Sequence, residues 1–219
     1  MLECDTADAS TLSDGLVSWW QCDGNADDSV GPNDGVLQNG VTFVAAPTGQ
    51  ALEFNGTTAD VLIQTSTTLN LTDGYTIAFW INVPTWPSQV TYIMEKLVAG
   101  AEDKAVMINT DGTIDFYLYN VMDLVPLESA TALTLNTWHH FAATYDGADA
   151  NIYIDGLFDA SKIAAGDVAN STGALAFAHN ATRAMYGSDT FFAGDLADIR
   201  WYSRALSAAE VAEIASGCN

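Results

Sequence analysis

The stretch YTIAFWINV, residues 75–83, decides the fold class of this chain. Tyr, Ile, Phe and Ile occupy every second position, and Thr, Ala, Trp and Asn occupy the positions between them. Successive side chains of a β-strand point to opposite faces of a sheet, so a period of two indicates a strand with one face on a core. The pattern therefore predicts a strand over residues 75–83.

Runs of similar composition recur on both sides of this stretch, separated by turns rich in Gly, Asn and Asp. The dipeptides Asn55-Gly56 and Asp111-Gly112 lie between such runs and favour hairpins. Strands at this spacing, without helical periodicity between them, predict an all-β sandwich of two antiparallel sheets. The other expected strands cover Gly15–Trp20, Ala51–Phe54, Asp60–Gln64, Val90–Leu97, Lys104–Asn109, Thr113–Tyr119, Trp138–Tyr145, Asn151–Ile154, Gly173–His179 and Thr190–Ser203.

One short helix is expected after the last strand. Ser207 can cap its first turn, and Glu210 stands at the third helical position, as in a capping box. Gly217 is placed to end the helix. An apolar stripe at helical spacing runs through Ala208, Val211, Ile214 and Ala215.

The chain has 219 residues, which suits a single sandwich domain. We expect that domain over residues 15–219, after an N-terminal extension of residues 1–14 that carries Cys4. Cys4 and Cys218 stand near opposite ends of the chain, and a sandwich whose first and last strands are neighbours would let them form a disulfide. Cys22 would then be a buried thiol, and a bridge from Cys22 to either end is the alternative. A disulfide would indicate an oxidising compartment.

The charge is strongly one-sided, with 28 acidic residues against 6 basic ones and a formal net charge of −22. Such a surface repels nucleic acid and anionic membranes, which are bound through Lys and Arg. Two explanations remain, a calcium site and a surface adapted to salty water. No apolar window of the length of a membrane span, roughly 18 residues, occurs. Residues 1–5 lack the features of a signal peptide, so we expect an extracellular, cell-surface or virion location with the leader absent from this chain.

Residues 23–35, DGNADDSVGPNDG, concentrate oxygen-bearing side chains and glycines. Calcium takes six to eight hard oxygen ligands, and glycines let a loop wrap round the ion. The spacing is not that of an EF-hand. The alternative is a polar connection in which Asp and Asn only provide turn chemistry.

A second acidic element, GDLADIR at residues 194–200, lies inside an expected strand. Strict alternation would place Leu196 and Asp198 on one face and Ile199 on the other. An Asp on a face shared with hydrophobic residues is either paired, for example with an arginine, or bound to a metal.

Seven segments between Gly15 and Ser216 resemble, in order, the motifs of LamG-like jelly-roll domains of the laminin-G/concanavalin-like kind. The resemblance departs at Asn55, where the family usually has Asp, and at Ala197, where it often has another Asp. It implies a two-sheet antiparallel jelly-roll sandwich with one short C-terminal helix. The segments are GLVSWW (15–20), DGNADD (23–28), GVLQNG (35–40), QALEFNG (50–56), WHHFAATYDG (138–147), IYIDG (152–156) and FAGDLADIRWYSRALS (192–207).

The resemblance also implies a structural calcium ion, Ca2+, held where the acidic opening loop meets the closing strand. The departure at Ala197 takes away one possible ligand. The candidate ligands carried over from the family are Asp23, Asn25, Asp28 and Asp198, with Asn33 and Asp34 as secondary ones.

No catalytic residues are expected. Related sandwiches that cleave glucans place two carboxylates on one strand in a Glu-x-Asp-x-x-Glu motif, which is absent around Glu53, Glu95, Glu102 and Glu128. His139 and His140 are adjacent in a strand and so point to opposite faces, which favours a structural role.

Sugar binding would need exposed aromatic side chains as stacking platforms. Trp86, on a loop between Pro84 and Pro87, is the first candidate, followed by Tyr92, Tyr119, Tyr186 and Phe191. Trp19, Trp80 and Trp138 are expected in the core instead.

The sequence therefore supports two hypotheses. The first is a non-catalytic, calcium-stabilised, lectin-like extracellular domain that binds a polysaccharide or glycoconjugate. The alternative is a structural or adhesive domain that contacts other proteins on a cell or virion surface.

Overall fold

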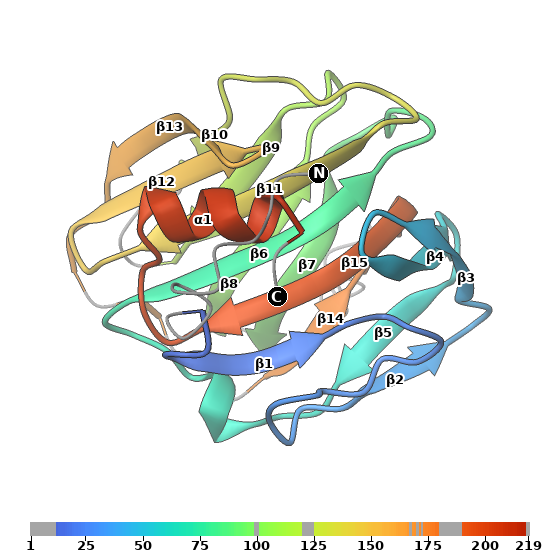
Figure 1. Ribbon diagram of the computed structural model, residues 1–219, viewed down its shortest axis with the longest axis horizontal. Coiled ribbons are helices and arrows are strands. Elements are labelled where there is room, and N and C mark those ends of the chain that lie inside the picture. Colours follow the sequence, from blue (N-terminus) through green and yellow to red (C-terminus); the bar gives the residue numbers. More distant parts are fainter. Residues whose placement is uncertain are drawn as a thin grey trace.

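The computed structural model describes residues 12–98, 101–119, 125–166, 168–169, 171, 173–179 and 190–217. In this part the regular secondary structure is almost entirely β, as predicted (Figure 1). The strands are β1 (Leu16–Trp20), β2 (Gly35–Gln38), β3 (Thr42–Ala46), β4 (Gly49–Asn55), β5 (Asp60–Ile63), β6 (Tyr75–Asn82), β7 (Thr91–Val98), β8 (Ala101–Ile108), β9 (Ile114–Leu118), β10 (Leu127–Glu128), β11 (Trp138–Tyr145), β12 (Asp149–Ile154), β13 (Leu157–Ile163), β14 (Ala174–Phe177) and β15 (Ala193–Tyr202).

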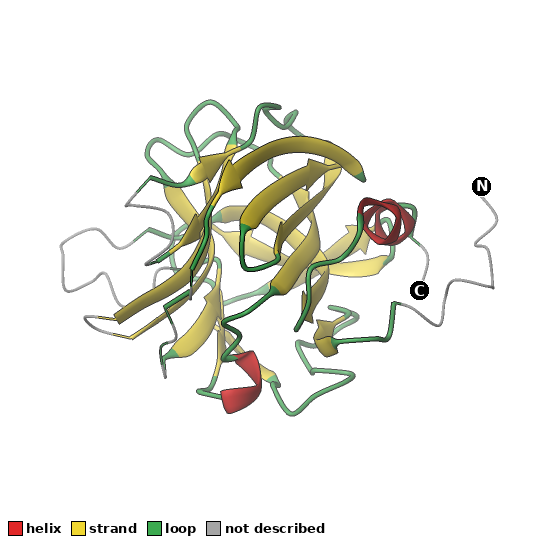
Figure 2. Cartoon of the chain, turned by 90° about the vertical axis from the view of Figure 1, so that its left-hand side faces the viewer, coloured by secondary structure: helices red, strands yellow, loops and turns green. Residues whose placement is uncertain are grey.

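The strands form two antiparallel sheets, of eight and seven strands among the described residues. The first sheet has the order β13-β12-β11-β6-β15-β4-β3, with β1 also paired to β15. The second has the order β10-β9-β8-β7-β14-β5-β2. Figure 2 shows the sheets as two curved layers. The predicted sandwich is therefore confirmed, while β2, β3, β10 and β13 were not expected from the sequence.

The core lies between the two sheets and is built on aromatic side chains. Tyr75 stacks on Trp201 with 6.3 Å between ring centroids and meets Phe116 edge-on at 6.0 Å. Trp20 packs edge-on against Phe177 at 5.2 Å. Such pairs contribute about 0.5–1.5 kcal/mol each beyond the area they bury.

The C-terminal helix forms as predicted, as α1 (Ala208–Ala215). The Ser207 side chain accepts from the Glu210 N–H, and the Glu210 side chain accepts from the Ser207 N–H, which completes a capping box. Val211 and Ile214 pack against the outer face of the eight-stranded sheet. Figures 1 and 2 show α1 outside the strands, over β11 and β12. One 3-10 turn, η1 (Thr67–Leu69), precedes β6.

The face assignment expected for residues 194–200 was wrong. The pairing register of β15 shifts between Ala197 and Arg200, and Asp198 adopts a left-handed φ of 49°. This β-bulge adds a residue, so Leu196 and Ile199 both pack in the core. Asp198 is thereby released from the core face.

The tryptophan assignment needs a similar correction. Trp19 and Trp80 are half-buried, and so is Trp138. The fully buried tryptophans are Trp20 and Trp201, at 0% and 1% exposed. Two adjacent tryptophans on a strand cannot share a face, so only one of residues 19 and 20 enters the core.

Charged side chains are also buried inside the protein, on β7 and β8. Lys96 donates to Asp103 at 2.7 Å, and Lys104 contacts the other oxygen of the same carboxylate. Burial lowers the pKa of Lys104, and the neighbouring Asp103 opposes that shift. Of the 6 basic residues in the chain, Lys96, Lys104 and Arg200 are thus at most 3% exposed. Half of the basic residues of the chain are therefore withdrawn from the surface.

Candidate functional site

The opening loop, residues 23–35, is organised around the buried carboxylate of Asp28. Its Oδ1 accepts from the backbone N–H groups of Trp19 (2.9 Å) and Val30 (3.1 Å), and its Oδ2 accepts from that of Asn33 (3.1 Å). Burial opposes ionisation of Asp28, but hydrogen bonds from the backbone of Gly31, Trp19 and Val30 outweigh it and lower its pKa. The carboxylate is therefore a charged anchor for the loop backbone.

Asn33 and Asp34 complete this anchor. The Asn33 amide donates to Ser18 Oγ at 2.7 Å and to Thr68 Oγ1 at 2.9 Å. Asp34 Oδ1 accepts from the Asp28 N–H at 2.9 Å. Both side chains hold the loop to its surroundings, so they act as turn and packing groups.

Asp23 and Asn25 lie apart from this anchor. Asp23 Oδ1 accepts from the Gln50 N–H at 2.7 Å, which ties the loop to β4. Asn25 is exposed and exchanges hydrogen bonds with Asp27, its amide donating to Asp27 Oδ2 at 2.9 Å. Neither interaction brings these side chains to Asp28.

Asp198, at the bulge of β15, is paired with an arginine. Arg200 donates to its two oxygens at 2.9 and 3.1 Å, and the Trp19 indole N–H donates to the same carboxylate. The Arg200 guanidinium lies 4.7 Å from the centre of the Trp19 ring. Burial alone would lower the pKa of Arg200, but Asp198 outweighs burial and raises it. Trp19 thus bonds to Asp28 through its backbone and to Asp198 through its side chain.

This arrangement does not fit a calcium site. Within the described part of the chain, no three His, Cys, Asp or Glu side chains come together in a way that could hold a metal ion. The oxygens of Asp28 and Asp198 already accept from N–H groups, and Ca2+ would have to displace several of these donors. Calcium binding stays a prediction of the sequence that the geometry does not favour.

Most of the aromatic residues proposed as platforms for sugar stacking pack against other parts of the chain. The Trp86 ring lies on the turn at Gly112, where a Cβ would stand 2.7 Å from the ring and where φ is +90°. Tyr92 is 8% exposed, and Tyr119 packs edge-on against Tyr117 with 4.3 Å between centroids. Tyr186 lies outside the described residues.

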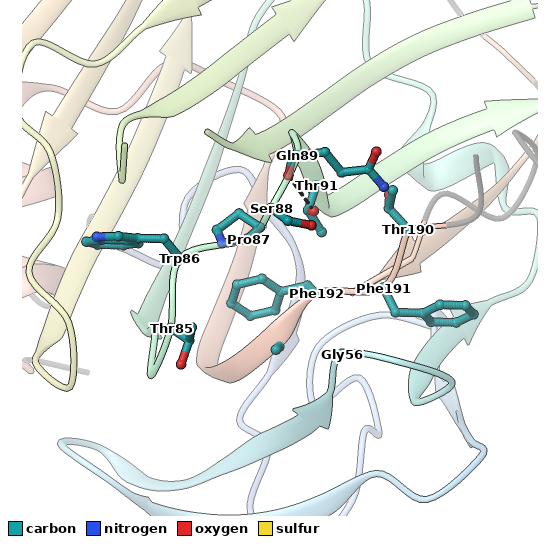
Figure 3. Close-up of a pocket in the computed structure, with 11 residues that line it drawn as sticks. Gly56, Thr85, Trp86, Pro87, Ser88, Gln89, Thr91, Thr190, Phe191 and Phe192 are labelled. Carbon is teal, nitrogen blue, oxygen red and sulfur yellow. Dashed lines mark hydrogen bonds between the residues drawn. The ribbon is translucent and has the colours of Figure 1, made fainter. Parts of the chain in front are cut away.

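A pocket of about 260 Å³ opens beside Trp86 (Figure 3). Three segments build it: the pocket loop between β6 and β7 (residues 83–90), the turn after β4, and the residues that lead into β15. Its lining is Gly56, Thr85, Trp86, Pro87, Ser88, Gln89, Thr91, Thr190, Phe191, Phe192 and Ala193.

The turn after β4 is held closely against the start of β15. Asn55 Oδ1 accepts from the backbone N–H groups of Thr57 and Thr58, each at 2.9 Å. Gly56 has a φ of +71°, and a Cβ there would stand 2.7 Å from the Ala193 Cβ. Only glycine allows both the left-handed φ and this close approach.

The pocket combines a buried ring with polar side chains. Phe192 is 2% exposed, and Figure 3 shows its ring beneath the pocket loop. The Trp86 ring points away from Phe192, so Trp86 contributes mainly its backbone position. Ser88 and Gln89 are exposed, and the Thr91 hydroxyl donates to the Gln89 carbonyl at 3.0 Å, which steadies the loop.

Sequence reasoning named Trp86 and Phe191 but missed the polar residues of the lining. Ser88, Gln89 and Thr190 are ordinary polar residues, and nothing in their spacing marks a site. The sequence features that could have pointed to this site were the loop from Pro84 to Pro87 and the Asn55-Gly56 turn, which lie far apart in the sequence. Only the sheet topology, which pairs β15 with both β4 and β6, brings these segments together.

Cysteine and histidine side chains have structural settings. Cys22 is free and buried, as expected, whereas Cys4 and Cys218 lie outside the described residues, so their disulfide stays a prediction. Burial, with a smaller contribution from Arg200, lowers the pKa of His140 to about 3, so its ring is neutral. His139 Nδ1 lies 2.8 Å from Asp155 Oδ2. No helix in the described ranges is long and apolar enough to cross a membrane.

Solved structures with similar folds include binding domains. Domain 4 of the extracellular arabinanase AbnA from Geobacillus stearothermophilus, in complex with arabinotriose, matches with a TM-score of 0.72 at 16% identity, over 91% of this chain and 98% of that one. The binding domain of Paraclostridial Mosquitocidal Protein 1 matches with a TM-score of 0.74 at 18% identity, over 94% of this chain and 53% of that one. At such identities the likeness establishes the fold.

The binding domain of Botulinum Neurotoxin DC in complex with SialylT matches with a TM-score of 0.71 at 12% identity. The match covers 94% of this chain and 52% of that one, so this chain spans about half of either toxin domain. No curated protein sequence matches the chain. The family model for the concanavalin A-like lectin/glucanases superfamily matches residues 55–212, which is more than half of the chain, and the chain therefore belongs to that superfamily.

Proposed function

We propose that this chain is a non-catalytic carbohydrate-binding domain that works outside the cell, and that one sugar residue of a polysaccharide or glycoconjugate occupies the pocket. The observation that carries this proposal is the lining. Hydroxyl and amide groups of Ser88, Gln89 and Thr91 surround a space floored by Phe192. Sugars present hydroxyls that these polar groups can bond, while Phe192, at 2% exposed, only closes the floor of the space.

The size of the pocket supports a single sugar ring. At ~30 Å³ for each water molecule, 260 Å³ is the space of about nine waters. It is smaller than a typical small-molecule site of ~300–1,000 Å³. A longer glycan would therefore extend from the pocket across the neighbouring loops.

Binding without hydrolysis is supported by the absence of acids from the lining. Glycoside hydrolysis needs two carboxyl groups on either side of the scissile bond, and the described residues that line this pocket include no Asp or Glu. The solved binding domains that share the fold include one with arabinotriose and one with SialylT.

Isothermal titration against neutral oligosaccharides, beginning with arabinotriose, tests the proposal. Ser88→Trp should fill the pocket and abolish binding, and Gln89→Ala should weaken it. Gln50→Ala is the matched control, because Gln50 is an exposed Gln near the other end of β4 from Asn55. If no glycan in a broad panel binds at millimolar concentration, the proposed function is wrong.

One observation favours the alternative, a structural or adhesive domain on a cell or virion surface. The edge strand β13 exposes Leu157, Phe158 and Ile163 at 72%, 60% and 79%. Exposed apolar edge strands are sites of strand pairing and protein contact. Sedimentation measures the oligomeric state of the wild type and of the double variant Leu157→Ser/Ile163→Ser. If this alternative holds, the wild type assembles and the variant does not.

A further inference from the structure

We infer that the pocket selects uncharged sugars and rejects uronic acids, sialic acids and sulfated glycans. This inference rests on the proposed function and adds the ligand class to it. Two independent observations carry it, the chemistry of the lining and the placement of the chain's few cations.

Among the residues that the structure describes, the lining contains no ionisable side chain. All eleven residues are Gly, Pro, Ala, Thr, Ser, Gln, Trp or Phe. A carboxylate or sulfate in the pocket would lose water and gain only neutral hydrogen bonds from these eleven residues. Burying a charge without an opposite charge is far more costly than burying a hydroxyl that finds a hydrogen-bond partner.

The cations of the described residues are occupied elsewhere. Lys96 and Lys104 are buried on Asp103, and Arg200 is buried on Asp198. The remaining two lie outside the pocket lining as well, with Arg204 paired to Glu210 at 2.7 Å and Lys162 on β13 donating to the Val125 carbonyl at 2.7 Å. The sixth basic residue, Arg183, lies outside the described residues.

The field of the whole molecule acts in the same direction. A net charge of −22 repels an anionic polymer before it reaches the pocket. This repulsion is screened by salt, since the Debye length falls from ~8 Å at 0.15 M to ~3 Å at 1 M ionic strength. The chemistry of the lining is local and much less sensitive to salt. Salt therefore separates the two contributions.

The test compares polygalacturonate with the same polymer after chemical reduction of its carboxyl groups, together with neutral arabinan and mannan. These probes are titrated into the full chain at 0.15 M and 1 M NaCl. We expect at least one neutral probe to bind, and polygalacturonate to bind at least about tenfold more weakly at both salt concentrations. Equal or tighter binding of polygalacturonate than of the neutral probes would overturn the inference and leave the proposed function standing. Binding of no probe here and of no glycan in the broad panel would instead reject the proposed function.

A pair of variants designed to gain binding separates the effect of the pocket lining from that of the net charge. Ser88→Lys places a cation at the exposed mouth of the pocket, and Gln50→Lys makes the same change of net charge away from it. Only Ser88→Lys should acquire binding to polygalacturonate. Equal gains from both variants would show that the global field, not the lining, sets the preference. Arg183→Gln is measured alongside. If the wild type binds polygalacturonate and Arg183→Gln does not, this result would also contradict the inference.

Discussion

The opening loop and the pocket loop are both polar, yet their side chains have opposite settings. In the opening loop Asp28 and Asn33 are 8% and 2% exposed, and their polar atoms bond to the chain itself. In the pocket loop Ser88 and Gln89 are exposed. The first loop holds strands in place, while the second leaves hydrogen-bonding groups for a partner.

The difference shows what a recognisable motif means in this fold. The opening loop carries the family motif, and its conspicuous acids stabilise the junction of β1 and β15. The pocket loop carries no motif, because binding groups in loops can vary while the scaffold stays the same. Substitutions in the first region should therefore change stability, and those in the second should change binding.

The largest effect is expected at the Asp198–Arg200 pair. Arg200→Met leaves a buried carboxylate, 4% exposed, without its cation, which typically costs about 3–5 kcal/mol. For a domain of this size each kcal/mol lowers Tm by about 2–4 °C, so we expect a fall of roughly 6–20 °C in thermal unfolding.

The double variant Asp198→Asn/Arg200→Met tests the cause. Asn tolerates the left-handed φ of 49° at this position and removes the stranded charge, so the double variant should recover part of the loss. Arg204→Met, at a partly exposed pair, should cost about 1 kcal/mol or less. A double variant as unstable as the single one would mean that Arg200 acts through packing on Trp19.

Asp28 comes next. Asp28→Ala leaves three backbone N–H groups without their acceptor, and we expect a loss of about 2–4 kcal/mol in urea unfolding. Asp27→Ala, in the exposed neighbour, is the control and should stay within about 0.5 kcal/mol of wild type. Similar losses in both variants would contradict the distinction between an anchor and a solvated acid.

Local patterns in the sequence predicted the regular elements well. Strand β6 and the cap formed by Ser207 and Glu210 were predictable because strand alternation and capping depend on neighbours in the chain. Strand β13 was not, because LFDASKI lacks a clean alternation and exposes its apolar residues at a sheet edge. The bulge at Asp198 was missed because an inserted residue leaves the composition of a strand unchanged.

The candidate site was predictable only in part. Trp86 was found from its loop, but its ring packs on Gly112, a contact between residues that belong to different hairpins. Phe192 lies beneath the pocket because β15 returns between β4 and β6, and no local pattern encodes that order. The acidic residues were noticed, but whether they face a metal or N–H groups depends on backbone geometry.

A pH experiment contrasts Asp28 with a carboxylate that lacks such donors. Asp115 Oδ1 is buried without a hydrogen-bond partner among the described residues. Burial raises the pKa of Asp115 to about 6 from 3.8, opposed by Asn109 and reinforced by Glu128 and Asp111. The folded state then binds the proton more tightly than the unfolded state, so this group's contribution to stability is highest below pH ~4 and is lost as pH rises to ~6.

The prediction is that Asp115→Asn stabilises the protein at pH 7 by about 1–2 kcal/mol and has little effect at pH 4. Asp28 has the opposite sign, since its lowered pKa gives stability that is present above pH ~4 and is lost in more acidic solution. Unfolding free energies of wild type and both variants, measured from pH 3 to 8, check both signs. A pH-independent effect of Asp115→Asn would show that the carboxyl titrates normally.

The smallest effect is expected from removing calcium. A bound ion at a hundredfold excess over its Kd would stabilise the fold by about 2.7 kcal/mol, or roughly 5–10 °C in Tm. Because Asp28 and Asp198 already accept from backbone, indole and guanidinium N–H groups, we expect excess chelator to shift Tm by less than about 2 °C at fixed salt. A drop of 5 °C or more that Asp23→Ala abolishes would contradict this expectation, confirm the calcium site predicted from the sequence, and show that the opening loop exchanges N–H donors for a metal ion.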